Sequence, residues 1–289
     1  MRPERDGRVR GGVCGRTGLS DPPPSIRGMD LESLRGEGVP LPAGRLVTAG
    51  EGDGGTLPLW LSDGPAPFGL WGRIRAAHPR TGLWPLLLEP LDGHEDFRPW
   101  GSGELFPGAS SRPADHEPAT VLARWWDDCV STGEDDDAPA VTAPYGRAWP
   151  GLAPGRTPVE DPGRPADEHA DALLSFGAEA RLGLVEAASG AEALVVTGWS
   201  GPVNHAGTGE IAAVVADWER RFGARVFAVG FDTLRLSVAA PPATLEEALP
   251  IAAEHFAFCP DNLWQGPCGD LTAYAEHLVG ADEWTFWWD

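Results

Sequence analysis

Residues 211–238, IAAVVADWERRFGARVFAVGFDTLRLSV, decide how the fold is read. The apolar residues of the first half recur at the spacing of one helix face, at Ile211, Val214, Val215, Trp218 and Phe222. Gly223 follows where a helix commonly ends in a left-handed residue. Residues 225–231 and 234–238 then predict two strands joined at Asp232-Thr233 as a hairpin. A helix that leads into an antiparallel strand pair is typical of a layered fold.

The flanking segments extend this pattern in both directions. Residues 182–187 and 193–199 predict two strands before the helix. After the hairpin, Thr244 and Glu247 form a capping box that opens a helix, which Pro250 should kink. A short helix over 271–279 and a strand over 283–289 complete the order β-β-α-β-β-α-α-β. This order predicts an α+β fold, with layered mixed, partly antiparallel sheets and helices, rather than a doubly wound parallel sheet.

The first half of the chain also predicts alternating strands and helices. Strands are expected at 46–48, 57–61 and 83–91, and helices at 68–78 and 118–130. Gly50, Gly52 and Gly55 have the spacing of a dinucleotide fingerprint, but a strand follows them where the fingerprint needs a helix. We therefore interpret this glycine-rich stretch as a hairpin loop.

Composition divides the chain into four segments. Residues 1–28, rich in Arg and Gly, are expected to be a disordered tail, and Met29 is a candidate for the true start of translation. An N-terminal α/β region is expected over 29–130, and an acidic, proline-rich linker over 131–168. A C-terminal domain is expected over 169–289.

The net charge and the cysteines limit which partners and which cellular compartment the sequence predicts. The net charge of −21 argues against nucleic acid or an anionic membrane as the main partner. No apolar run approaches the roughly 18 residues of a membrane-spanning helix. Residues 1–28 contain no apolar signal-peptide core, and the four cysteines are widely scattered, so we expect a cytoplasmic protein with free thiols.

Loop residues are the only candidates for catalysis. Gly198-Trp199-Ser200-Gly201-Pro202 resembles a nucleophile elbow, but Pro202 stands where the last glycine belongs. Asn204 and His205 in the same loop, together with Asp261, are the catalytic candidates, although Asp261 also suits the N-cap of a short turn.

A metal site is considered at His255 and Cys259, which lie four residues apart on a predicted helix. The chain has no CxxC pair, so we expect Cys259 to be a small buried hydrophobe, with neither metal nor cofactor bound.

The aromatic C-terminus predicts a buried strand. Trp284, Phe286 and Trp288 share one face of such a strand, which we expect to pack on the helices carrying Trp218 and Phe256. Trp287 lies on the other face and is a candidate anchor for a partner. The full set of candidate binding residues is Trp199, Trp264, Trp287 and Asp289.

The last hundred residues resemble a known family. The strings FAFCPDNLWQG (256–266), PPATLEEAL (241–249) and WTFWWD (284–289) are similar to the bacterial domain of unknown function 4253 family. Pro250 and Cys268 depart from that pattern. The resemblance implies a domain-sized unit over the C-terminal region and no particular chemistry.

Two functional hypotheses remain open. The first is an acidic binding protein of the immunity or adaptor type, whose partner is a basic protein, supported by the charge and the abundant tryptophan. The second is a small hydrolytic enzyme that uses Asn204, His205 and Asp261. Convergence of these three side chains in one pocket would favour the enzyme.

Overall fold

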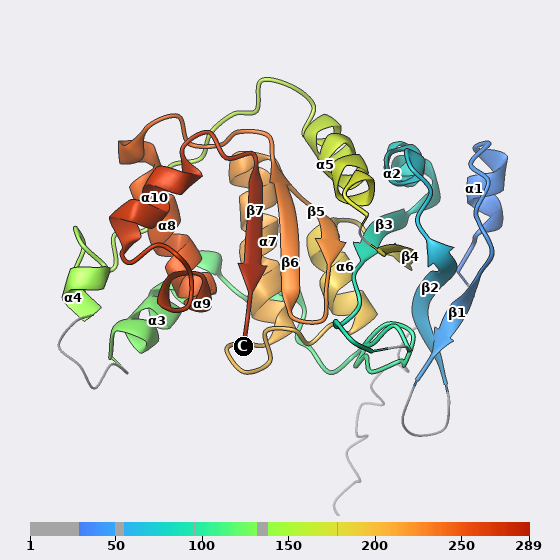
Figure 1. Cartoon of the computed structure of the whole chain (residues 1–289), viewed down its shortest axis with the longest axis horizontal. Coiled ribbons are helices and arrows are strands. Elements are labelled where there is room, and N and C mark those ends of the chain that lie inside the picture. The colour runs from blue at the N-terminus through green and yellow to red at the C-terminus, as the bar shows by residue number, and fades with distance from the viewer. Residues whose placement is uncertain (1–28, 50–54, 95, 132–137, 178) are drawn as a thin grey trace, which may run out of the picture.

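The sheet of this protein combines strands from both halves of the chain (Figure 1). The computed structural model describes residues 29–49, 55–94, 96–131, 138–177 and 179–289. They contain a seven-stranded mixed sheet of order β1-β2-β4-β3-β5-β6-β7. The strands are β1 (Gly44–Thr48), β2 (Thr56–Pro65), β3 (Leu83–Leu88), β4 (Arg181–Glu186), β5 (Ala224–Val229), β6 (Thr233–Val238) and β7 (Glu283–Trp287).

Helices and a 3-10 turn connect these strands. They are α1 (Glu32–Gly36), α2 (Leu70–Thr81), η1 (Pro113–Asp115), α3 (Pro118–Ser131), α4 (Ala138–Val141), α5 (Gly163–Ser175), α6 (Gly190–Thr197), α7 (Thr208–Phe222), α8 (Leu245–Phe258), α9 (Asp261–Trp264) and α10 (Leu271–Leu278). The mixture of helices with a partly antiparallel sheet confirms the α+β prediction. The predicted tail over 1–28 and the acid run 134–137 lie outside the described residues.

Both predicted hairpins are present. β5 and β6 are antiparallel, with Val226 opposite Leu236, and Gly223 ends α7 at a φ of 64°. β1 and β2 are also antiparallel, which confirms a hairpin where the glycine spacing resembled a nucleotide site. Residues 50–54 of that loop are not among those described.

The order of strands does not follow the order of the chain. β4, from the C-terminal region, lies between β2 and β3 of the N-terminal region and is antiparallel to both. β3 is parallel to β5, with Leu87 opposite Ala228. The predicted boundary at 131–168 therefore rests on a change in composition along the chain. The strands before and after it belong to one sheet.

The strand predicted over 193–199 is wrong, because this segment belongs to α6. Ser189 accepts a hydrogen bond from the Glu192 amide, and the Glu192 carboxylate accepts one from the Ala188 amide. This pair of bonds is a variant of the capping box, in which the glutamate accepts from the residue before the N-cap, and it favours a helix over the strand that the valines alone would predict. Gly198 ends α6 at a φ of 74°. From β4 onward the order is therefore β-α-α-β-β-α-α-α-β.

The sheet is covered on both faces. One core cluster joins the sheet to α3, α6, α7, α8 and α10, and another joins the opposite face to α1, α2 and α5. In Figure 1, α5 and α2 lie in front of the sheet and α7 lies behind it. β3 occupies the middle of the sheet, and all six of its residues are buried.

The C-terminal strand is part of the core, as the alternation of its aromatic residues predicted. Trp284, Phe286 and Trp288 are each at most 2 % exposed. The Phe286 ring stacks on Trp218 of α7 at 5.4 Å and meets Phe258 of α8 edge-on at 4.7 Å. β7 therefore pairs with β6 along one edge and packs its aromatic side chains against α7 and α8.

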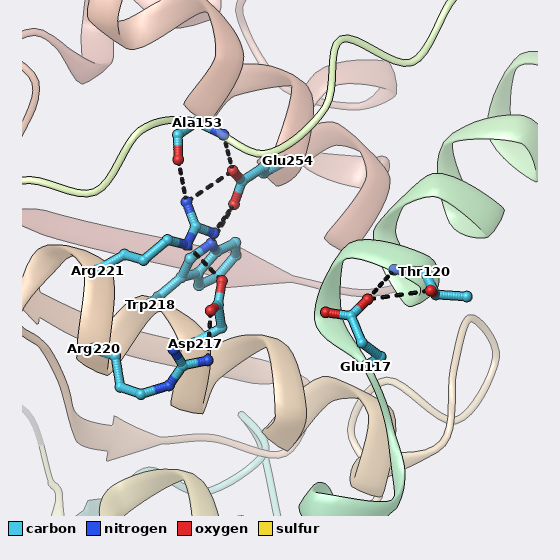
Figure 2. Close-up of polar contacts among 8 residues, drawn as sticks. All are labelled: Glu117, Thr120, Ala153, Asp217, Trp218, Arg220, Arg221 and Glu254. Atoms are coloured by element: carbon cyan, nitrogen blue, oxygen red, sulfur yellow. Dashed lines mark hydrogen bonds and ion pairs between the residues drawn. The ribbon is translucent and has the colours of Figure 1, made fainter.

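A buried ion pair fastens the extended segment 149–156 to α7 and α8 (Figure 2). The Glu254 carboxylate accepts hydrogen bonds from the Ala153 amide at 2.6 Å, from the Trp218 indole at 2.7 Å and from the Arg221 guanidinium. Arg221 also donates to the Ala153 carbonyl and to Asp217. Because each charge in this buried group has several partners, the group stabilises the fold rather than offering a reactive side chain.

Candidate edge cleft

A cleft lies where the parallel strands β3 and β5 end. The loop after β3, the loop after α6 and the C-terminus meet there, at the lower edge of the sheet in Figure 1. The cavity has a volume of about 360 Å³, and its lining includes Arg98, Glu104, Phe106, Trp199, Val203, Asn204, Asp232 and Asp289. The carboxyl ends of parallel strands are the usual place for ligands in open sheets, because the connecting loops diverge there.

The loop after β3 is held in shape by its own side chains. The Trp100 indole donates to the Glu89 carbonyl at 2.9 Å, and Arg98 Nε donates to both oxygens of Glu104 at 2.8 and 2.9 Å. Phe97 has a φ of 56°, a conformation that bulky residues rarely adopt and that costs about 1–3 kcal/mol. Strain of this kind gathers at binding sites, where the surrounding structure must hold it.

The buried side chain of Trp199 forms a wall of the cleft. Its indole N–H donates to the carbonyls of Gly230 at 2.9 Å and Phe231 at 3.2 Å, and the residue is 1 % exposed. Trp199 thus ties the loop after α6 to the β5–β6 turn. Its ring is not available as an anchor on the surface, the role for which it was a candidate.

Two further carboxylates, Asp232 and Asp289, line the cleft. Burial raises the pKa of Asp232, the charges of Asp289 and Asp92 raise it further, and a hydrogen bond from the Trp287 side chain opposes them. Asn204 Nδ2 donates to a terminal oxygen of Asp289 at 3.2 Å. Within the described part of the chain, no Arg or His forms an ion pair with Asp232 or Asp289. A cation placed between them would relieve their repulsion.

Exposed apolar side chains form the rim. Phe106 is 55 % exposed and Val203 is 70 % exposed, and both line the cavity. A neighbouring hollow of about 320 Å³ shares Phe231 and Asp232 and extends to Trp287, which is 36 % exposed. The surface therefore offers apolar contact beside negative charge.

Among the described residues, the three predicted catalytic residues line no common pocket. Asn204 lines the edge cleft, whereas Asp261 lines a separate hollow of about 350 Å³ beside α9 and α10. His205 Nε2 hydrogen-bonds the Ala257 carbonyl at 3.1 Å, and its ring lies 5.3 Å from the Trp125 ring. Burial lowers the pKa of His205.

Asp261 differs from its predicted role as an N-cap. Pro260 occupies the N-cap position and Asp261 is the first residue of α9. Its Oδ1 accepts a hydrogen bond from Gln265 at 3.0 Å, and its Oδ2 accepts one from the Asp289 amide at 3.2 Å. Its side chain therefore fastens the C-terminus rather than capping α9.

His255 and Cys259 have separate partners in the core. Cys259 Sγ donates to the Trp287 carbonyl at 2.9 Å, and burial raises the pKa of its thiol to about 12. His255 Nδ1 lies 3.1 Å from the Tyr274 hydroxyl, and burial lowers the pKa of its imidazole to about 3. Across the described ranges, no group of three His, Cys, Asp or Glu side chains is arranged to hold a metal ion.

The remaining candidate anchors are at the surface. Trp264 is 46 % exposed, and its ring meets Phe256 edge-on at 5.5 Å. It lies outside the linings of the edge cleft and of the hollow that adjoins it. Trp287 is the better-placed of the two, because it lines that hollow and contacts Asp232. A binding role for either residue stays a prediction.

The sequence interpretation missed Arg98, Phe106 and Asp232. Asp232 was visible only as a hairpin turn residue, and nothing along the chain linked the loop after β3 to that turn. The link comes from the parallel pairing of β3 with β5, which a local pattern cannot indicate.

Residues 181–289 match the model of a family described as domain of unknown function (DUF4253). This confirms the resemblance over the C-terminal region. The match begins at the first residue of β4 and ends at the last residue of the chain. No curated protein and no solved structure matches the chain. None of the described helices is long and apolar enough to cross a membrane.

Proposed function

We propose that this protein is an acidic binding module whose edge cleft takes a basic segment of a partner protein. The observation that carries the proposal is the position of Asp232 and Asp289, which lack a cationic partner among the described residues and lie beside the exposed Phe106 and Val203. A segment with an Arg or Lys next to a large apolar side chain complements both features. The cytoplasm, where such a partner would be met, belongs to the same proposal.

The energetics of association favour this arrangement. An apolar anchor in a concave site supplies most of the binding free energy in typical interfaces. Complementary charge adds specificity and speeds the encounter, and the net charge of −21 draws basic partners toward the whole molecule. The rigid loop carrying Phe106 limits the entropy lost on binding.

Binding of a short fluorescent peptide of alternating Arg and Leu, followed by anisotropy, tests the proposal. Phe106→Ser and Asp232→Asn should each weaken binding by about tenfold or more, the loss expected for a central interface residue. Two matched controls lie away from the cleft. Phe176→Ser makes the same substitution at a phenylalanine that is 91 % exposed, and Glu276→Gln removes a carboxylate on α10. Both controls should bind as the wild type does.

The dependence of peptide binding on salt concentration and on peptide charge shows whether the cleft's negative charge takes part in binding. A peptide of Glu and Leu should not bind, and binding of the Arg and Leu peptide should weaken as salt rises. Equal losses in the cleft variants and in the two controls would refute the edge cleft as the site.

The hydrolytic alternative built on Asn204, His205 and Asp261 stays a prediction. Asn204 and Asp261 line different hollows, although both contact Asp289, and His205 hydrogen-bonds the Ala257 carbonyl. No observation at these residues favours it over binding.

A further inference from the structure

Three side chains outside the edge cleft have the order of a nucleophile, a base and an orienting carboxylate. Ser111 lies on an exposed loop before η1, and its Oγ is 2.6 Å from Nε2 of His116. The other ring nitrogen of His116, Nδ1, is 3.9 Å from Oε1 of Glu210 in the first turn of α7. The arrangement is recognised by these contacts and not by any spacing in the sequence.

The carboxylate favours the protonation state that a nucleophilic serine needs. Its negative charge favours a proton on Nδ1 of His116, which leaves the Nε2 lone pair free to accept the hydrogen bond of the Ser111 hydroxyl. The 3.9 Å separation is an ion-pair distance, and such contacts shorten when substrate binds. Arg124 holds Oε1 of Glu210 at 2.7 Å, so the position of the carboxylate is fixed.

The N-terminus of α7 supplies donors for a developing negative charge. This fifteen-residue helix has Gly207 at its N-cap, with no side-chain cap. The amides of Thr208 and Gly209 have no hydrogen-bond acceptor among the residues that the structure describes. A Cβ on Gly209 would lie 2.3 Å from the Ser111 carbonyl oxygen and 2.4 Å from its Oγ. Only glycine therefore lets the serine approach these donors closely.

We propose that Ser111, His116 and Glu210 form a hydrolytic centre for activated carboxylic esters. Ser111 Oγ attacks the ester carbonyl carbon while its proton moves to Nε2 of His116, and the oxyanion faces the Gly209 amide. The bond to the leaving alcohol then breaks, and that alcohol takes the proton from His116. Water, deprotonated by the same ring, releases the acid and restores the serine. This activity lies beyond the proposed binding function and does not rest on it.

The full-length protein tests this with a fluorophosphonate probe and with p-nitrophenyl acetate. The probe should phosphonylate Ser111, located by mass spectrometry of the peptides. Ser111→Ala should lose both labelling and ester hydrolysis, whereas Ser110→Ala, the same change one residue earlier, should keep both. His116→Gln should slow hydrolysis by about 100-fold or more, the usual contribution of a general base.

Glu210 is a positioning residue and needs a different readout. Glu210→Gln should lower kcat less than His116→Gln does and should leave KM unchanged, because the carboxylate orients the imidazole and does not bind the ester. Each variant is compared with the wild type by circular dichroism, so that loss of fold is distinguished from loss of chemistry. An unlabelled Ser111, or equal hydrolysis by Ser111→Ala and wild type, would overturn the proposal and leave the contact as a surface hydrogen bond.

Discussion

The two halves of the chain differ in how their strands find partners. In the C-terminal half, β5, β6 and β7 pair in chain order and are antiparallel, with α8, α9 and α10 between β6 and β7. In the N-terminal half, β1 and β2 form a hairpin, but β3 pairs with β4 and β5, both of the other half. The family-matched segment 181–289 therefore lacks the strand that joins β4 to β5. A segment can be delimited as a family unit without containing a complete sheet.

The two faces of the sheet also differ in what covers them. Behind β6 and β7, aromatic rings dominate, with Trp218, Phe258 and Phe286 in mutual contact. On the opposite face, the helices α2 and α5 cover β3 and β4 with mostly aliphatic side chains around Trp71.

The largest expected effect is the loss of folding when residues 181–289 are expressed alone. Without β3, the facing edges of β4 and β5 are unpaired and the buried side chains of Leu86, Leu87 and Leu88 are missing. We expect no cooperative thermal transition in circular dichroism.

A split protein is the matched control for that fragment. Residues 29–131 and 138–289, produced together, keep every strand pair of the sheet and should assemble into one folded complex. A cooperative transition in the 181–289 fragment alone would show that β3 is dispensable. It would contradict the inference that β4 and β5 need a strand from the N-terminal half.

Truncation after Glu283 tests the aromatic core. It removes Trp284, Phe286 and Trp288, whose truncation typically costs about 3–5 kcal/mol each, so the loss is comparable to the stability of a whole domain. We expect the truncated chain to be unfolded. Loss of the near-ultraviolet circular dichroism signal of its tryptophans would show this. Removing Asp289 alone, which loses only its contacts with Asn204 and Asp261, should leave that signal in place.

Glu254 and Glu117, both shown in Figure 2, allow a buried carboxylate to be compared with an exposed one. Glu254→Ala leaves Arg221 buried with fewer partners and should lower the free energy of unfolding by about 3–5 kcal/mol. Glu117→Ala removes an exposed cap, whose oxygen accepts from the Thr120 amide at 2.8 Å, and should cost about 1 kcal/mol. Urea denaturation measures both, and equal losses would mean that the buried group does not fasten segment 149–156.

The smallest expected effect is a pH-dependent contact between α5 and β7. Contact with Glu283 raises the pKa of His169 above 6.5, against burial, and contact with His169 lowers the pKa of Glu283 below 4.5. The histidine contribution is present below pH 6.5 and is lost as the pH rises through its raised pKa. The glutamate contribution is present above pH 4.5 and is lost as the pH falls through its lowered pKa.

The contact should therefore stabilise the protein most between pH 4.5 and 6.5. Because both side chains are partly exposed, the gain should stay below about 1 kcal/mol. His169→Gln should lose stability at about pH 5.5 and lose less at about pH 8.5, measured by urea unfolding. The exposed His94→Gln is the control, and the same pH profile in both variants would contradict the contact.

Local signals predicted many elements, missed α4 and α5, which begin inside the predicted linker, and assigned one segment wrongly for an identifiable reason. The helix carrying Trp218, both hairpins and the buried C-terminal strand follow from periodicity and turn residues. Residues 193–199 were assigned as a strand from their apolar run, while the capping box at Ser189 and Glu192 went unused. At the candidate site, Asn204, Trp199 and Asp289 were named from the sequence, but Arg98, Phe106 and Asp232 were not.

The sequence by itself determined the α+β class, the acidic character and the burial of Trp284, Phe286 and Trp288, because these depend on composition and on spacing along one element. Only the tertiary structure decided that β4 lies between β2 and β3, and that β3 runs parallel to β5. Those pairings join residues about a hundred positions or more apart, whose contacts no local pattern encodes. The edge cleft depends on the same pairings, since Arg98, Asp232 and Asp289 come together only when the strands that carry their loops are side by side.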